Sequence, residues 1–169
     1  MNEILTYKQA APYIRKVKRL LKSMVSMDTF IKETNKDIAE IKALAEKDGK
    51  KNALLVFTKR TGENPENDFS EYIRKLEVSL IRSQNLRSKI QNALRTIPNK
   101  TAQDVIEYYY ILSNSLDDTC EKYSYSHSSV CRFKKIGLAK MAEQLFGVII
   151  EEKNISIPLY PEDEFAGNE

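Results

Sequence analysis

Residues 124–142 read SYSHSSVCRFKKIGLAKMA, and this stretch decides how the rest of the chain is interpreted. It contains four basic residues and no acidic one. Its apolar residues recur every three to five positions, which is the spacing of a helix with one buried face. These apolar residues are Val130, Phe133, Leu138 and Met141. The stretch therefore predicts a basic helix, which is either a solvated surface helix or a helix that reads DNA.

Three helix-start signals lie before the basic helix or at its first residue. Thr101 with Asp104, and Ser115 with Asp118, have the spacing of a capped helix start, and Ser126 can cap the basic helix itself. Short serine-containing turns separate the three helical segments. A helix of about 12 residues, one of about eight and a basic helix that ends near Phe146 together predict a helix-turn-helix domain.

In this domain we expect the first two helices to hold the third in place. The predicted core comprises Ile106, Tyr110, Leu112, Leu116, Val130, Phe133 and Leu138. The recognition helix, at about 126–140, would then enter the major groove, where Arg pairs with guanine and Lys neutralises phosphates. The residues predicted to contact DNA are His127, Ser128, Ser129, Cys131, Arg132, Lys134 and Lys135.

The stretch YYYILSNSLDDTCEKYSYSHSSVCRFKKIGLAKMAEQL (residues 108–145) resembles region 4 of bacterial sigma factors. It is more similar to phage-encoded regulators of the RinA and ArpU type, which control late genes. The positions that match are Ser115, Ser126, Val130, Arg132 and Leu138. Ser113 replaces the usual turn glycine, and Thr119 replaces a buried aliphatic residue. The resemblance implies a DNA-binding transcriptional regulator that also contacts RNA polymerase.

A regular heptad pattern occupies the first third of the chain. Its ten positions are Tyr13, Val17, Leu20, Met24, Met27, Ile31, Thr34, Ile38, Ile41 and Ala45. The alternating steps of four and three predict one continuous long helix, in a coiled coil or a helical hairpin. We assign oligomerisation to Val17, Leu20, Met24, Met27, Ile31 and Ile38, with pairing either within or between chains. The cations of residues 15–22 are interpreted as a solvated face, with contact to the DNA backbone as the alternative.

A second long helix is expected from about Asn67 to Thr96, antiparallel to the first. Between them, residues 54–57 predict either a short strand or one helical turn. The fold class is therefore all-α, a long helical hairpin or coiled coil followed by the helix-turn-helix. The expected parts are a long-helix region (1–97), a DNA-binding domain (98–147) and an acidic tail (148–169) that is extended or disordered.

Charge is distributed unevenly along the chain. The net charge of +3 combines −5 in residues 151–169 with +8 in the rest, which favours a polyanion-binding body with an acidic tail. No apolar run is long enough for a membrane span and no signal peptide is recognisable, so we expect a cytoplasmic protein, in the host if phage-encoded. The Cys120–His127–Cys131 spacing is irregular for zinc, and we expect no metal, cofactor or enzymatic activity.

These observations predict a sequence-specific double-stranded-DNA-binding regulator of phage late genes that acts as a homodimer. One alternative is a DNA-packaging adaptor similar to a small terminase subunit, which would form a ring. The other is a protein-binding coiled-coil module that does not bind DNA.

Overall fold

The computed structural model describes residues 3–62 and 68–152. Most of them are helical, which confirms the all-α prediction. They form two compact units. Residues 3–25 with 88–152 are called the terminal unit below, and residues 26–87 the central unit. The expected boundaries at 97 and 147 differ from this division, because the first helix belongs to the same unit as the carboxy-terminal helices.

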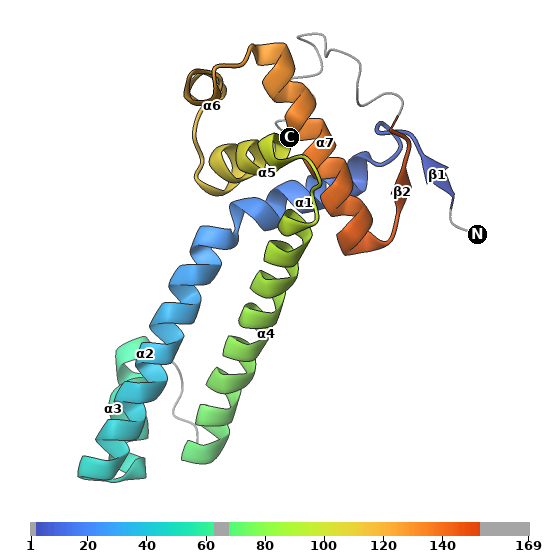
Figure 1. The fold of residues 1–169 in the computed structure, drawn as a ribbon. Coiled ribbons are helices and arrows are strands. Elements are labelled where there is room, and N and C mark those ends of the chain that lie inside the picture. The colour runs from blue at the N-terminus through green and yellow to red at the C-terminus, as the bar shows by residue number, and fades with distance from the viewer. Residues whose placement is uncertain (1–2, 63–67, 153–169) are drawn as a thin grey trace. The chain divides into compact units, whose positions relative to one another are not determined.

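The elements follow one another in the order labelled in Figure 1. They are β1 (Ile4–Leu5), α1 (Ala11–Lys22), α2 (Met24–Asp48), α3 (Lys50–Thr61), α4 (Phe69–Arg95), α5 (Lys100–Ile106), the π-helical segment η1 (Glu107–Ile111), α6 (Leu116–Tyr123), α7 (His127–Phe146) and β2 (Ile149–Ile150). None of the helices in the described ranges combines the length and apolarity that a membrane span requires.

Helix α7 is the centre of the terminal unit. It packs against α1, α5 and α6, and Figure 1 shows it crossing α1 and α5. Because three helices cover it, α7 buries much more than one apolar stripe. Its buried residues are Val130, Cys131, Phe133, Gly137, Leu138, Ala139, Met141 and Ala142. The contact with α1 continues to the last turn of α7, where the rings of Tyr13 and Phe146 lie 5.6 Å apart.

The strands β1 and β2 pair in parallel, with Ile4 opposite Ile149 and Leu5 opposite Ile150. The Ile150 amide donates a hydrogen bond to the Glu143 carboxylate of α7 at 3.1 Å, which fixes β2 against the helix. The expected tail thus begins with an ordered strand. The rest of it, from residue 153 onward, lies outside the described residues.

Helices α2, α3 and α4 build the central unit. Its core contains Ile41, Ala53, Leu54, Phe57, Tyr72 and Ile73. Asp28 of α2 pairs with Arg87 of α4, and Lys42 of α2 pairs with Glu77 of α4 at 3.3 Å. Residue numbers therefore increase along α2 in the direction in which they decrease along α4. The two helices therefore run antiparallel in this unit. Residues 54–57 belong to helix α3 rather than to a strand, and Leu54 and Phe57 supply part of this core.

The prediction of one continuous heptad helix is wrong. Helix α1 ends at Lys22 and α2 begins at Met24. At the junction the Ser23 hydroxyl donates a hydrogen bond to the Leu20 carbonyl at 2.7 Å, a backbone contact that competes with regular helix geometry. All ten heptad positions are nevertheless buried or half-buried.

The heptad face is covered within a single chain. The residues assigned to oligomerisation include Val17, Met24 and Ile38, which are buried, and Leu20, Met27 and Ile31, which are half-buried. A residue that is buried inside the chain is not available for contact with a second copy. The assignment of Val17, Met24 and Ile38 to oligomerisation is therefore corrected, whereas that of the half-buried Leu20, Met27 and Ile31 stays a prediction.

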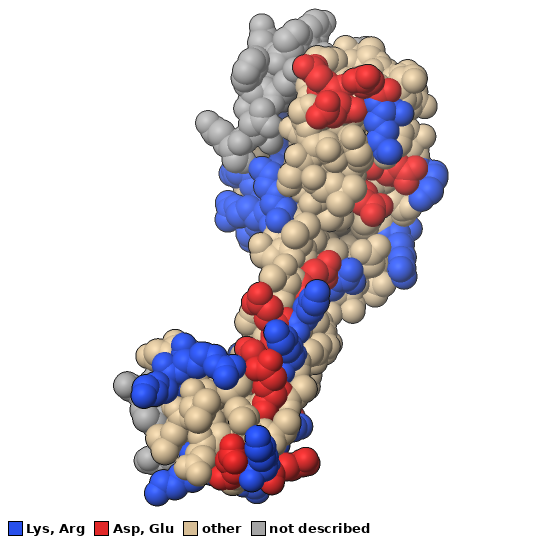
Figure 2. All heavy atoms as spheres, turned by 90° about the vertical axis from the view of Figure 1, so that its left-hand side faces the viewer, with Lys and Arg blue, Asp and Glu red and all other residues tan. Residues whose placement is uncertain are grey.

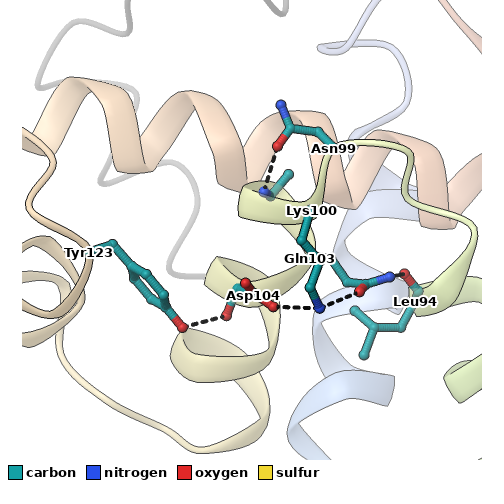
Figure 3. A network of polar contacts seen from close by, with 7 residues as sticks. Leu94, Asn99, Lys100, Gln103, Asp104 and Tyr123 are labelled. Carbon is teal, nitrogen blue, oxygen red and sulfur yellow. Dashed lines mark hydrogen bonds and ion pairs between the residues drawn. The ribbon is translucent and has the colours of Figure 1, made fainter.

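A polar network fixes the start of α5 (Figure 3). Asn99, not Thr101, caps this helix, because its side chain accepts a hydrogen bond from the Ala102 amide at 3.0 Å. Gln103 donates to the Leu94 carbonyl at the end of α4. Tyr123 of α6 donates to the Asp104 carbonyl at 3.3 Å, so α6 is also anchored to α5. The predicted caps Ser115 and Ser126 are confirmed, since their side chains accept from the amides of Asp118 and Ser129.

Segment η1 changes the register of the helix that continues from α5. The Leu112 amide donates to the Glu107 carbonyl, five residues back, which widens the turn. Tyr110 consequently faces the core and Leu112 is 57% exposed, so its predicted burial is wrong. Leu116 is only half-buried, and the other five predicted core residues are buried.

Candidate nucleic-acid interface

The first turn of α7 begins with side chains that are exposed on the terminal unit. Ser124, in the left-handed region at φ 56°, ends α6 and reverses the chain. Ser126 then caps α7 by accepting from the Ser129 amide at 3.2 Å. His127 and Ser128 are exposed at this end of the helix. The helix amides of the first turn add partial positive charge there.

One stripe of α7 is accessible to solvent. Ser128 is exposed, and Ser129, Arg132, Ile136 and Lys140 are half-buried along the same side. These positions follow the spacing of three and four residues that places side chains on one helix face. Four of the predicted DNA contacts, His127, Ser128, Ser129 and Arg132, therefore lie together on or beside this stripe. The Arg132 guanidinium lies 5.5 Å from the centroid of the Phe133 ring.

Three other predicted contacts are directed into the protein. Cys131 is 3% exposed and belongs to the core. The Lys134 ammonium lies 3.9 Å from the Tyr109 ring centroid, and the Lys135 ammonium lies 4.9 Å from that of Tyr7. These residues lie on the sides of α7 that α1, η1 and the N-terminal segment cover. The assignment of Cys131 to an exposed recognition face is therefore wrong, and Lys134 and Lys135, which are half-buried against aromatic rings, lie away from the accessible stripe.

Helix α6 places acidic side chains next to the start of α7. Asp117, Asp118 and Glu121 are exposed, and Figure 2 shows acidic side chains gathered at this end of the unit. Asp117 Oδ1 lies 2.8 Å from His127 Nε2. These carboxylates oppose the approach of phosphates to this end of α7. The sequence LDDTCE (residues 116–121) already contains these three acidic residues.

Two departures from the resembling families have a structural explanation. Ser113 adopts φ 56°, the left-handed conformation in which a glycine is favoured. Thr119 is fully buried where those families have an aliphatic residue. Its hydroxyl donates to the Ser115 carbonyl at 2.7 Å, so the buried polar group is satisfied.

Helix α1 carries a second group of exposed cations, Arg15, Lys16, Arg19 and Lys22. Residues 4–27 contain no Asp or Glu. Lys18, on the same helix, is buried. Burial, together with the charges of Lys134, Lys22 and Arg15, lowers the pKa of Lys18 to about 8.

The described residues contain no group of three metal-ligating side chains, and His127 contacts Asp117. Comparisons with protein families, with curated proteins and with solved structures returned no match for this chain.

Proposed function

We propose that this protein binds double-stranded DNA with sequence preference and regulates transcription, with α6 and α7 acting as a helix-turn-helix. The observation that carries the proposal is the accessible stripe at the start of α7. The exposed His127 and Ser128 and the half-buried Arg132 lie at the start of a helix that three other helices hold in place. A rigid helix that presents polar side chains at its first turns is the usual reader of the major groove.

Arg132 has the central role in this proposal. A guanidinium donates two parallel hydrogen bonds to guanine O6 and N7, and serine and histidine side chains also bond to base edges. Its ring contact with Phe133 limits the freedom of the side chain before DNA arrives. Preorganisation of this kind lowers the entropy lost on binding.

A homodimer that reads two half-sites, and a contact with RNA polymerase, belong to the same proposal. The dimer interface must use residues other than Val17, Met24 and Ile38, because these are buried within the chain. Sedimentation of the purified protein distinguishes a dimer from the ring of a packaging adaptor.

Selection of bound duplexes from a random pool tests the proposal. A regulator enriches one motif, and its binding weakens as salt increases. A protein-binding module that does not contact DNA would enrich no sequence and would show no salt-dependent duplex binding.

A further inference from the structure

Helix α1 carries the densest uncompensated positive charge of the described residues. Arg15, Arg19 and Lys22 are exposed, and no acidic side chain of the described ranges pairs with any of them. Lys16 is exposed too, and its ammonium contacts only aromatic rings, 5.6 Å from the centroid of Phe146. The four cations occupy one side of the helix over about 10 Å.

The central unit distributes its charges differently. Several of its cations pair with carboxylates, as in Lys42–Glu77, Arg60–Glu40 and Arg87–Asp28. Figure 2 shows basic and acidic side chains interleaved over this unit, whereas basic side chains gather on one flank of the terminal unit. An ordinary solvated helix surface mixes both signs of charge, as the central unit does. The α1 face does not follow that pattern.

Mutual repulsion among the cations of α1 is evident at Lys18. Its ammonium is buried, and after burial the largest contributions that lower its pKa come from Lys134, Lys22 and Arg15. Positive potential is thus concentrated on and beneath α1. A ligand with closely spaced negative charges relieves this repulsion, and duplex DNA has one phosphate charge per about 1.7 Å of its axis.

We infer that the face of α1 formed by Arg15, Lys16, Arg19 and Lys22 binds the phosphate backbone of double-stranded DNA independently of base sequence. This surface lies on a different helix from the reading stripe of α7, but the inference rests on the proposed function in that both bind duplex DNA. The positive charge of this α1 face also offsets the repulsion that the acidic residues of α6 exert on phosphates near the start of α7.

The test is a titration of full-length protein with a labelled duplex of arbitrary sequence at several NaCl concentrations. The triple variant Arg15→Gln, Arg19→Gln, Lys22→Gln removes three exposed charges. The slope of log K against log salt should decrease in magnitude by about 2–3, and low-salt affinity should decrease tenfold or more. Circular dichroism should show an unchanged fold, since all three side chains are exposed.

Two matched controls separate a site from an effect of total charge. Arg15→Lys with Arg19→Lys keeps the charge and should keep the wild-type slope. Lys32→Gln, Lys51→Gln and Lys59→Gln remove three exposed cations from the central unit and should change the slope by less than one. The inference is overturned if the α1 triple variant keeps the wild-type slope of log K against log salt. It is also overturned if the central-unit variant loses as much slope as the α1 triple variant.

The outcomes also distinguish this inference from the proposed function. If the α1 variant keeps its slope while wild-type protein still selects one motif, only the α1 inference fails. If the slope decreases as expected but no motif is selected, the sequence-reading function of α7 fails. If wild-type protein binds heparin but no duplex, both fail.

Discussion

Gly137 of α7 lies so close to Ile106 of α5 that a Cβ atom at position 137 would be 2.5 Å from Ile106 Cγ1. Ile106 is fully buried, and Ile97 Cδ1 lies 3.5 Å from the same point. A carbon–carbon separation below 3 Å is strongly repulsive, so only a residue without a side chain fits here. The missing methyl group permits the close contact between α5 and α7.

Gly137→Ala should therefore destabilise the protein, although alanine favours helices. Overpacking costs about 1–3 kcal/mol and the better helix propensity recovers about 1 kcal/mol. Urea unfolding measures the net loss. In an Ile106→Ala background the new methyl group has space, so the same change should be neutral or stabilising. If Gly137→Ala lowers the free energy of unfolding equally in the wild-type and Ile106→Ala backgrounds, the close contact between Gly137 and Ile106 is contradicted.

Asn99 and Thr101 form a matched pair for testing the cap of α5. Asn99→Ala removes the acceptor of the Ala102 amide and should lower the free energy of unfolding by about 1 kcal/mol. Thr101→Ala should change it by less than about 0.5 kcal/mol, since Thr101 caps nothing. A larger loss at Thr101 than at Asn99 in thermal or urea unfolding would support the capping box expected from sequence.

The central unit depends on Ile41, which is fully buried in its core. Ile41→Asp places an unpaired carboxylate there and should cost about 4 kcal/mol or more, seen as lost helicity in circular dichroism. Ile81→Asp is the control, because Ile81 is 53% exposed on α4. Its effect should stay below about 1 kcal/mol. If Ile41→Asp leaves helicity and sedimenting mass unchanged, the core is wrongly placed.

Lys18 makes the free energy of unfolding depend on pH in the alkaline range. Its pKa is lowered from 10.5 to about 8 in the folded protein, so the folded state releases this proton before the unfolded state does. The unfolded chain therefore binds more protons between pH 8 and 10, and stability should increase with pH in that window. Above pH 10 stability should decrease, because burial raises the pKa values of Tyr7 and Tyr110 and only the unfolded chain ionises them.

Urea unfolding at pH 7 and pH 9.5 checks this prediction. Lys18→Met keeps the apolar stem and removes the charge, so the increase between the two pH values should largely disappear. Lys16→Met, at an exposed position on the same helix, should retain it. If the free energy of unfolding of Lys18→Met increases between pH 7 and pH 9.5 as much as that of the wild type, other groups cause the pH dependence.

Local signals in the sequence predicted the carboxy-terminal helices well. Serine caps and short turns placed α6 and α7 correctly, because capping depends on residues three positions apart. The sequence could not reveal that α7 is covered on three sides. That arrangement depends on α1, more than 100 residues earlier, and it buries Cys131 and leaves Lys134 and Lys135 half-buried.

Other errors have comparably specific causes. The heptad pattern continues through Ser23, so its periodicity could not reveal the junction between α1 and α2. The π-helical turn at η1 shifts Leu112 outward by adding one residue, which a fixed period of 3.6 does not anticipate. The α1 cations were visible, but their lack of acidic partners became apparent only from the structure.

Selection from a random duplex pool, run in parallel on wild-type protein, Arg132→Ala and Arg95→Ala, tests the central claim most directly. Arg95 is an exposed cation at the end of α4 and serves as the charge control. We expect one motif for wild type and for Arg95→Ala. For Arg132→Ala we expect lost preference at a single base position, with a cost of about 1–3 kcal/mol on the original motif. An unchanged motif in Arg132→Ala, or no enrichment by wild-type protein, would contradict base reading by α7.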